Sequence, residues 1–271
     1  MTPSTRARFA EVVRAEPVDL ATACLLLGAE VRQDLELGPY LAELDALAGR
    51  ARLLLAGAGS PLQAAEVLRV ALGEQAGFGG RPADYLDLRS SLLHEVLDRH
   101  RGLPILLSVV WLEVAGRLGV PAYGVGLPGH FVVGIGTPAG ESVLVDPFAG
   151  GRLLPAGVAE LARSAGVEPE PTHLAPWPPT EILLRMLNNI RQLAAAVEHA
   201  RTRLWAVELA LLLPRHPLAL RREHGELLAG LGDLLGGAAE LTAYAEAVAP
   251  VDPNAAEVAL HEARLARARL N

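Results

Sequence analysis

A long apolar segment near the middle of the chain, ILLSVVWLEVAGRLG, is bounded by residues that start and stop helices. Pro104 suits the first turn of a helix, and Gly119 followed by Pro121 ends it. Because the segment is apolar on most of its faces, it predicts a helix buried at the centre of a domain. The neighbouring elements are therefore expected to pack around this helix.

Three strand-like segments follow this helix: AYGVGL, HFVVGI and SVLVDP. The last two are joined by GTPAGE, a short connection rich in Gly and Pro that indicates a hairpin. If the turn is centred on Pro138, His130 and Asp146 lie directly opposite each other on one face, with Cβ atoms about 5 Å apart. A slip of one residue would place them on opposite faces.

A carboxylate beside an imidazole fixes the tautomer of the ring and raises its basicity. This is the half of a catalytic triad that holds the base and its orienting group. Gly129 precedes His130 and permits close approach of a backbone or a ligand, while Asp146 ends its strand, where loops open and sites form. The alternative is a hydrogen bond between His130 and Asp146 that only stabilises the hairpin.

Both ends of the chain show helical periodicity. We therefore predict an N-terminal helical subdomain over residues 1–76, followed by a core domain over residues 77–167 that contains the hairpin. Residues 168–179 contain five prolines and are interpreted as a linker. Residues 180–271 are predicted to be helical again.

A repeated pair of helix breakers divides this C-terminal part. Pro214 and Pro217 return as Pro250 and Pro253, 36 residues later. A helix-turn-helix unit of about 34 residues is typical of tetratricopeptide repeats. The spacing therefore predicts antiparallel helix pairs that stack on one another.

Composition limits the partners and cofactors. The chain has a formal net charge of −7 and no Lys, which argues against a nucleic-acid partner. Cys24 is the one cysteine, so an internal disulfide and a cysteine metal cluster are excluded, and we predict no metal or other cofactor. No signal peptide or membrane-spanning run is visible. We therefore expect a cytoplasmic protein without a membrane partner.

Three motifs occur in a specific order: RGLPI, LPGHF and VDPFAGG. Together they resemble the transglutaminase-like core, and specifically the bacterial SirB-type branch, which joins that core to a C-terminal tetratricopeptide region. The resemblance covers essentially the whole chain and is strongest from about residue 78 to residue 154. It implies an α+β fold, in which a papain-like core with a small antiparallel sheet lies between N-terminal helices and tetratricopeptide-like helix pairs.

The resemblance also implies site residues. Active transglutaminase-like proteins have a Cys nucleophile at the N-terminus of the central helix, and a His and an Asp on two adjacent strands that match His130 and Asp146. The Cys position falls near Pro104, which has no nucleophile. Ser108, one turn further, is a candidate substitute, although a Ser there more often bonds to its own helix. Cys24 is a second candidate, although a lone Cys on an apolar helix is usually a small buried hydrophobe.

Glu95 and Arg101 match the Glu and Arg of the family pattern NEVLxRRxG. With Pro104 and Gly129 they are candidates to line a groove beside His130. The alternative is an ion pair on a solvated helix face, formed by an acidic and a basic residue of the same EVLDRHR segment: Glu95 or Asp98 with Arg99 or Arg101.

Four other polar residues of this region are given structural roles. Ser90 or Ser91 is expected to cap a short helix that Gly102 stops. His94 and His100 depart from the family pattern and are interpreted as surface histidines.

Because the nucleophile position holds Pro104, the preferred hypothesis is a non-catalytic protein. It would bind a protein or peptide partner through the groove beside His130 and Asp146 and through the helical stack. The alternative is a hydrolase or acyltransferase of the transglutaminase-like superfamily that uses Ser108. The two hypotheses differ in whether a side-chain nucleophile lies within reach of His130.

Overall fold

The computed structural model describes residues 4–55, 59–154, 174–196 and 199–270. Two compact units make up the chain: Pro17–Ile182, called the core unit below, and Met1–Glu16 with Leu183–Asn271, called the helical unit. The domain boundaries drawn from the sequence remain predictions. The first half of the predicted linker, and the end of the predicted core domain, lie outside the described residues.

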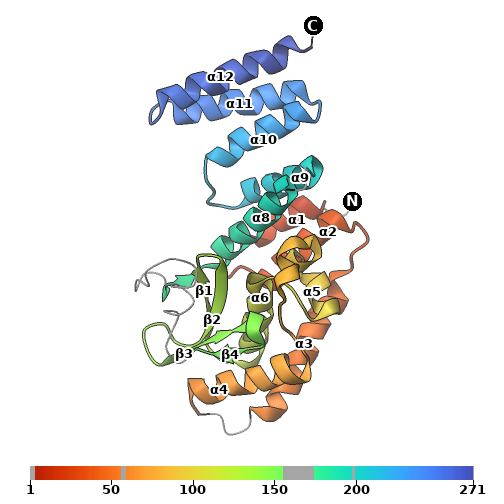
Figure 1. Ribbon diagram of the computed structural model, residues 1–271, viewed down its shortest axis with the longest axis vertical. Helices are drawn as coiled ribbons and strands as arrows, with labels where there is room; N and C mark the ends of the chain where they lie inside the picture. Colours follow the sequence, from red (N-terminus) through yellow and green to blue (C-terminus); the bar gives the residue numbers. More distant parts are fainter. Residues whose placement is uncertain (1–3, 56–58, 155–173, 197–198, 271) are drawn as a thin grey trace. The chain divides into compact units, whose positions relative to one another are not determined.

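The N-terminal half of the core unit is helical (Figure 1). Asp19 caps the first of its helices by accepting the N–H of Thr22, and Ser60 caps the helix that begins at Pro61. The elements are α2 (Leu20–Val31), α3 (Leu37–Leu54), α4 (Pro61–Leu68), the π-helical turn η1 (Arg69–Gln75), the 3-10 turns η2 (Pro82–Leu86) and η3 (Leu88–Ser91), and α5 (Leu93–Arg99).

Helix α6 (Pro104–Leu118) is the predicted central helix. Its residues from Pro104 to Trp111 are all buried, and it contacts α2, α3, α5 and the sheet. Gly119 ends it with a φ of 72°, a left-handed conformation that glycine adopts without strain. The prediction of a buried helix at the centre of the domain is confirmed.

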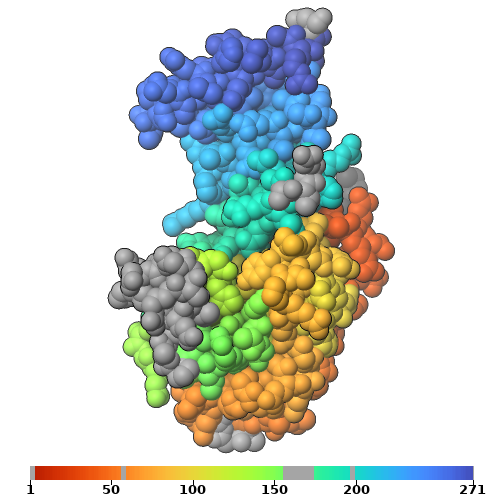
Figure 2. Space-filling model, in the orientation of Figure 1, coloured from red at the N-terminus to blue at the C-terminus, as the bar shows by residue number. Residues whose placement is uncertain are grey.

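A five-stranded antiparallel sheet with the order β4-β3-β2-β1-β5 follows. Helix α4 packs against β2 and β3, and the space-filling view shows α4, in orange, at the surface near the green hairpin (Figure 2). The elements are β1 (Ala122–Leu127), β2 (His130–Gly136), β3 (Ser142–Asp146), the 3-10 turn η4 (Pro147–Ala149), β4 (Arg152–Leu153) and β5 (Pro176–Trp177).

The register of the β2–β3 hairpin differs from the expected one by two residues. Val133 pairs with Val145, so the turn is centred on Ala139 and not on Pro138. His130 and Asp146 are therefore diagonal neighbours, and the expectation that they lie directly opposite each other is wrong. A shift of two residues leaves every side chain on its predicted face, because the period of a strand is two.

The helical unit consists of α1 (Thr5–Val12), most of α8 (Pro179–Ala196), α9 (Ala200–Leu212), α10 (Ala219–Gly230), α11 (Leu234–Val248) and α12 (Pro253–Ala268). Asp233 and Asp252 cap the last two helices. The predicted breakers separate helices as expected: Pro214 and Pro217 lie between α9 and α10, and Pro250 lies between α11 and α12.

Small residues let α10, α11 and α12 pack closely (Figure 1). A Cβ atom on Gly237 would lie 2.7 Å from the backbone oxygen of Gly225 and 2.7 Å from the backbone nitrogen of Ala229. Four alanines of α12 form its buried face.

Among the described residues, no helix combines the length and the apolar character needed to cross a bilayer.

Candidate functional site

The His130–Asp146 pair forms where β2 begins and β3 ends. His130 Nε2 lies 2.9 Å from Asp146 Oδ1, so the predicted hydrogen bond between these side chains is present. An ionised carboxylate only accepts hydrogen bonds, so His130 donates from Nε2, and Nδ1 is then the basic nitrogen of the neutral ring. The Asp146 side chain is 4% exposed and that of His130 is 15% exposed.

The turn after β3 holds the Asp146 carboxylate in place. Its Oδ1 also accepts the backbone N–H groups of Phe148 at 3.0 Å and Ala149 at 3.4 Å. Asp146 thus caps the short η4 turn, which begins at Pro147. Arg152 Nη2 lies 3.8 Å from Oδ2, with the arginine side chain 61% exposed. These contacts together fix the orientation of the carboxylate toward His130.

Aromatic rings surround the pair on one side. The ring of Phe148 meets that of His130 edge-on, with centroids 5.9 Å apart, and the Tyr85 ring lies 5.6 Å from Phe148. The Tyr85 hydroxyl donates to the Gly129 carbonyl at 3.5 Å. A Cβ atom on Gly80 would lie 1.9 Å from the Phe148 ring, so this contact requires glycine. Sequence reasoning missed Tyr85 and Phe148, although VDPFAGG placed Phe148 next to the site.

The N-terminus of α6 carries no side-chain nucleophile at its first two positions. Pro104 is buried in the first turn, and Ile105 follows it. Ser108 is fully buried, and its hydroxyl lies 3.5 Å from the Phe131 carbonyl of β2. The contact is long for an O–H···O bond and joins α6 to the sheet. The expectation that Ser108 bonds to its own helix is therefore wrong.

Cys24 lies inside α2 and is completely buried. Burial, and to a smaller extent the charges of Glu113 and Asp19, raise the pKa of its thiol well above the ordinary value. A buried thiol of this kind is a poor nucleophile. The interpretation of Cys24 as a small buried hydrophobe is confirmed.

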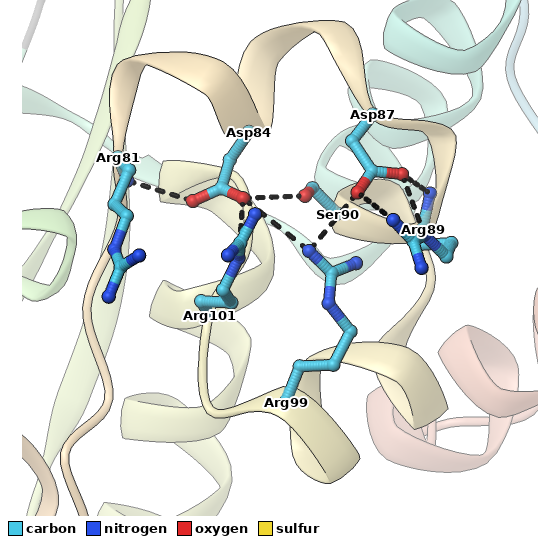
Figure 3. Close-up of polar contacts among 7 residues, drawn as sticks. All are labelled: Arg81, Asp84, Asp87, Arg89, Ser90, Arg99 and Arg101. Carbon is cyan, nitrogen blue, oxygen red and sulfur yellow. Dashed lines mark hydrogen bonds and ion pairs between the residues drawn. The ribbon is translucent and has the colours of Figure 1, made fainter.

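Arg101 takes part in a cluster that the sequence did not predict (Figure 3). Its Nε lies 2.9 Å from Oδ1 of Asp84, and Arg99 Nη2 lies 3.5 Å from the same oxygen and 3.2 Å from Asp87. The alternative interpretation, an ion pair of Arg99 or Arg101 with Glu95 or Asp98, is therefore wrong. Asp98 accepts the Tyr40 hydroxyl, and Glu95 lies 3.8 Å from His94 Nε2.

Asp84 is the centre of this cluster and is fully buried. It accepts the Arg81 backbone N–H at 2.8 Å and the Ser90 hydroxyl at 3.2 Å, besides Arg101. Ser90 thus bonds to Asp84 and does not cap α5, whose N-cap is Leu92. A carboxylate inside a protein is tolerated only when it is paired in this way. An Asp in a Pro-containing turn gives no sequence signal of such burial.

Of the two histidines interpreted as surface residues, His94 is buried, which corrects the interpretation, and His100 is half-buried. His94 is 3% exposed and packs edge-on against Tyr40. Burial lowers its pKa more than Glu95 and Asp98 raise it. His100 is half-buried, stacks on Phe78 with ring centroids 4.4 Å apart, and donates from Nδ1 to a backbone carbonyl. Both side chains therefore belong to the packing of the core unit.

Two cavities bordered by described residues lie apart from the His130–Asp146 pair, which is called the dyad below. One, of about 780 Å³, is bordered by Arg32 and by four acidic residues: Asp34, Glu36, Glu43 and Asp98. The other, of about 490 Å³, lies between the α3–α4 connection, the end of α6 and the β2–β3 turn. In the parts of the chain that the structure describes, no group of three or more His, Cys, Asp or Glu side chains is arranged to hold a metal ion.

Comparisons with known proteins match the sequence that forms this site to a family. The family model of the transglutaminase-like superfamily matches residues 38–188, which include α6, the hairpin and the Asp84 cluster. A UPF0162 protein of Xylella fastidiosa strain Temecula1 is 38% identical over 193 residues, covering 68% of this chain and 67% of the relative. A UPF0162 protein of Pseudomonas aeruginosa is 35% identical over 184 residues, covering 67% of each chain.

A shorter similarity extends to animals. F-box only protein 21 of the mouse is 31% identical over 99 residues, which is 34% of this chain and 16% of that protein. No solved structure matches the chain significantly. The family model covers more than half of the chain, and the bacterial relatives cover two thirds of it. The chain therefore belongs to the transglutaminase-like superfamily.

Proposed function

We propose that this chain is a non-catalytic transglutaminase-like protein that binds a protein or peptide partner. The first binding face lies beside His130 and Asp146, where Glu95, Arg101, Pro104 and Gly129 were expected to line a groove. The second is the helical unit, in line with the SirB-type architecture and its tetratricopeptide repeats. We further propose that the protein acts in the cytoplasm, without a nucleic-acid or membrane partner.

One observation carries the non-catalytic part of this proposal: Pro104 stands in the first turn of α6. The positive end of a helix dipole would lower the pKa of a thiol at this position and make it reactive. Proline has no group that can attack a carbonyl. Asp146 can orient the His130 ring, and the ring can accept a proton. Covalent acyl transfer also needs a nucleophile about 3 Å from the imidazole.

The alternative, a hydrolase that uses Ser108, is less well supported. Ser108 is fully buried, and its hydroxyl is directed at the Phe131 carbonyl. To act, the hydroxyl would have to leave this contact and reach a substrate through the packed interior. Its burial and its contact with β2 favour a role in joining helix and sheet.

Activity assays on the purified chain test the proposal. We expect no turnover of ester, amide or glutamine-donor substrates above that of a His130→Ala variant measured in parallel. Turnover that is present in the wild type and absent in both His130→Ala and Ser108→Ala would establish the hydrolase alternative. Ser91→Ala is a suitable control, because Ser91 is also a buried serine of the core unit.

A gain-of-function variant tests whether the nucleophile position is the missing part. Pro104→Cys places a thiol in the first turn of α6, where the helix dipole and His130 would favour the thiolate. We expect alkylation by iodoacetamide to extend to lower pH in Pro104→Cys than in Pro104→Cys/His130→Ala. Equal alkylation rates in the two variants would mean that His130 does not activate a thiol at position 104. The site would then not be an active triad that lacks only its nucleophile. Cys24 adds little background because it is buried.

A further inference from the structure

The η2 turn exposes two large apolar side chains beside the dyad. Tyr85 is 44% exposed and Leu86 is 81% exposed. The Tyr85 ring adjoins Phe148, whose ring in turn meets His130 edge-on. Through its hydroxyl Tyr85 also contacts the Gly129 carbonyl, directly before β2. The exposed apolar surface of η2 is therefore continuous with the surroundings of His130.

The Asp84 cluster holds this turn in one conformation (Figure 3). Asp84 lies inside η2, immediately before Tyr85, and its carboxylate is bound by Arg81, Ser90 and Arg101. A buried ion pair often adds little stability, and its best-attested role is to specify one arrangement. A surface whose backbone is already fixed loses less conformational entropy on binding. The cluster thus presents Tyr85 and Leu86 on a rigid support.

Two exposed arginines lie on segments that adjoin Phe148 and Asp146. Arg81 joins the Asp84 cluster only through its backbone N–H, and Figure 3 shows its guanidinium directed away from the carboxylates. Arg152 is 61% exposed, and its Nη2 lies 3.8 Å from Oδ2 of Asp146. Gly80, next to Arg81, packs directly against Phe148, which brings the two segments together. Arg81 and Arg152 thus bring exposed guanidinium groups to the segments around Phe148, on a chain with a net charge of −7.

We propose that Arg81, Tyr85, Leu86 and Arg152 form a docking face for a peptide segment that carries a bulky apolar side chain next to a carboxylate. The proposal rests on the proposed function and specifies the partner of that site. The apolar side chain would pack on Tyr85 and Leu86. The carboxylate would accept charge-assisted hydrogen bonds from Arg81 or Arg152, whose planar guanidinium groups suit bidentate binding. Tyrosine and arginine, like tryptophan, are enriched among the residues that dominate binding energy at interfaces.

Selection from a library tests this face. Random twelve-residue peptides displayed on phage are selected against the immobilised full chain, and enriched peptides are synthesised with a fluorescent label. Their affinities are then measured by fluorescence anisotropy. We expect enriched sequences in which Leu, Ile, Phe or Trp stands beside Asp or Glu. Their affinity should fall as salt is raised, because exposed charges are screened.

Matched variants locate the binding. Leu86→Ser and Arg81→Glu should each weaken the enriched peptides by about tenfold or more, the size of effect typical of a central contact residue. Leu53→Ser is the control, because Leu53 is 82% exposed on α3 and Leu86 is 81% exposed on η2. Thermal unfolding should be nearly the same for the variants and the wild type, since the changed side chains are exposed.

The possible outcomes separate the two proposals. Enriched peptides that bind Leu86→Ser and Arg81→Glu as tightly as the wild type would overturn this docking face and leave the proposed binding function standing. Enrichment of basic peptides would overturn the charge assignment, and with it the proposal. A failure to enrich any peptide would overturn both. A dimer of the chain that dissociates in Leu86→Ser would identify the occupant as a second copy, which also contradicts a peptide ligand.

Discussion

Asp84 in the core unit and Glu223 in the helical unit each bind two arginines, in different surroundings. Asp84 is fully buried and binds Arg101 and Arg99 between two irregular turns and the end of α5. Glu223 is 12% exposed and binds Arg191 and Arg203, which come from α8 and α9. The first carboxylate organises segments that have no regular structure of their own. The second links helices whose shape is already set by their backbone hydrogen bonds.

The difference extends to packing. The helical unit relies on glycine and alanine at its helix contacts, a pattern that each helix can supply independently. The core unit has a single central helix, and the turns beside its dyad depend on charged partners brought from other elements. Buried charge therefore occurs where the chain must hold one irregular conformation, and the predictions below test this interpretation.

The largest effect is expected at Asp84. Asp84→Asn leaves Arg99 and Arg101 partly buried without their shared counter-charge, and breaking a buried ion pair in this way costs about 3–5 kcal/mol. Glu223→Gln, the matched change in the helical unit, should cost less, about 1 kcal/mol, because the Glu223 side chain is 12% exposed and keeps contact with water, whereas Asp84 is fully buried. Urea unfolding followed by circular dichroism measures both. Equal losses in the two variants would show that burial does not distinguish the two carboxylates.

An intermediate effect is expected at the glycine contact of the helical unit. In Gly237→Ala the new methyl group would meet backbone atoms of α10, which cannot rotate away, so the helices must separate. We expect a loss of about 1–3 kcal/mol, as for other overpacked sites. Gly230→Ala, in α10, meets no atom within 4 Å and should stabilise the helix by about 0.5–1 kcal/mol. A gain in stability in Gly237→Ala would contradict the close packing.

The features predicted from the sequence are those that depend on neighbouring residues. The central helix follows from its own periodicity and its breakers, and the shared face of His130 and Asp146 depends only on the parity of two strands. The exact register failed because GTPAGE permits more than one turn centre, and only the packed structure selects Ala139. The helices after residue 180 were predicted for the same local reason.

The missed features depend on partners far apart in the chain. Asp84 is buried because Arg101, 17 residues later, reaches it, and His94 is buried because α2 and Tyr40 cover it. No periodic pattern in the sequence predicts that Asp84 or His94 is buried. Ser108 could be placed on the central helix, but its contact with the Phe131 carbonyl requires the sheet to be positioned first. The position of Ser108 on its helix therefore does not predict this contact.

The smallest effect is expected from pH, and it should have opposite signs in the two units. In the core unit, burial lowers the pKa of His94. The unfolded chain, with a histidine pKa of about 6.5, then binds the proton more readily than the folded chain. The contribution of His94 to stability is therefore present above about pH 6.5 and is lost as the pH falls below it.

In the helical unit, Glu208 of α9 and Glu240 of α11 lie 3.8 Å and 3.6 Å from the ring nitrogens of His224, and they raise its pKa. Arg221 and Arg6 pair with the same two carboxylates and limit the effect. The contribution of His224 is fully present below about pH 6.5 and is lost as the pH rises through its folded pKa.

Two variants separate these contributions. His224→Gln should lose more stability, relative to the wild type, at about pH 5.5 than at about pH 8, because only the protonated ring attracts the two carboxylates. His94→Gln should show the reverse, since at about pH 5.5 the wild type already bears the cost of a buried histidine that resists protonation. Proton NMR titration of the wild type gives the direct measurement: the His224 ring should titrate above the ordinary histidine value and the His94 ring below it. If His94 titrated above His224, the contrast between a buried neutral ring in the core unit and a charge-paired ring in the helical unit would be wrong, whatever the stability curves showed.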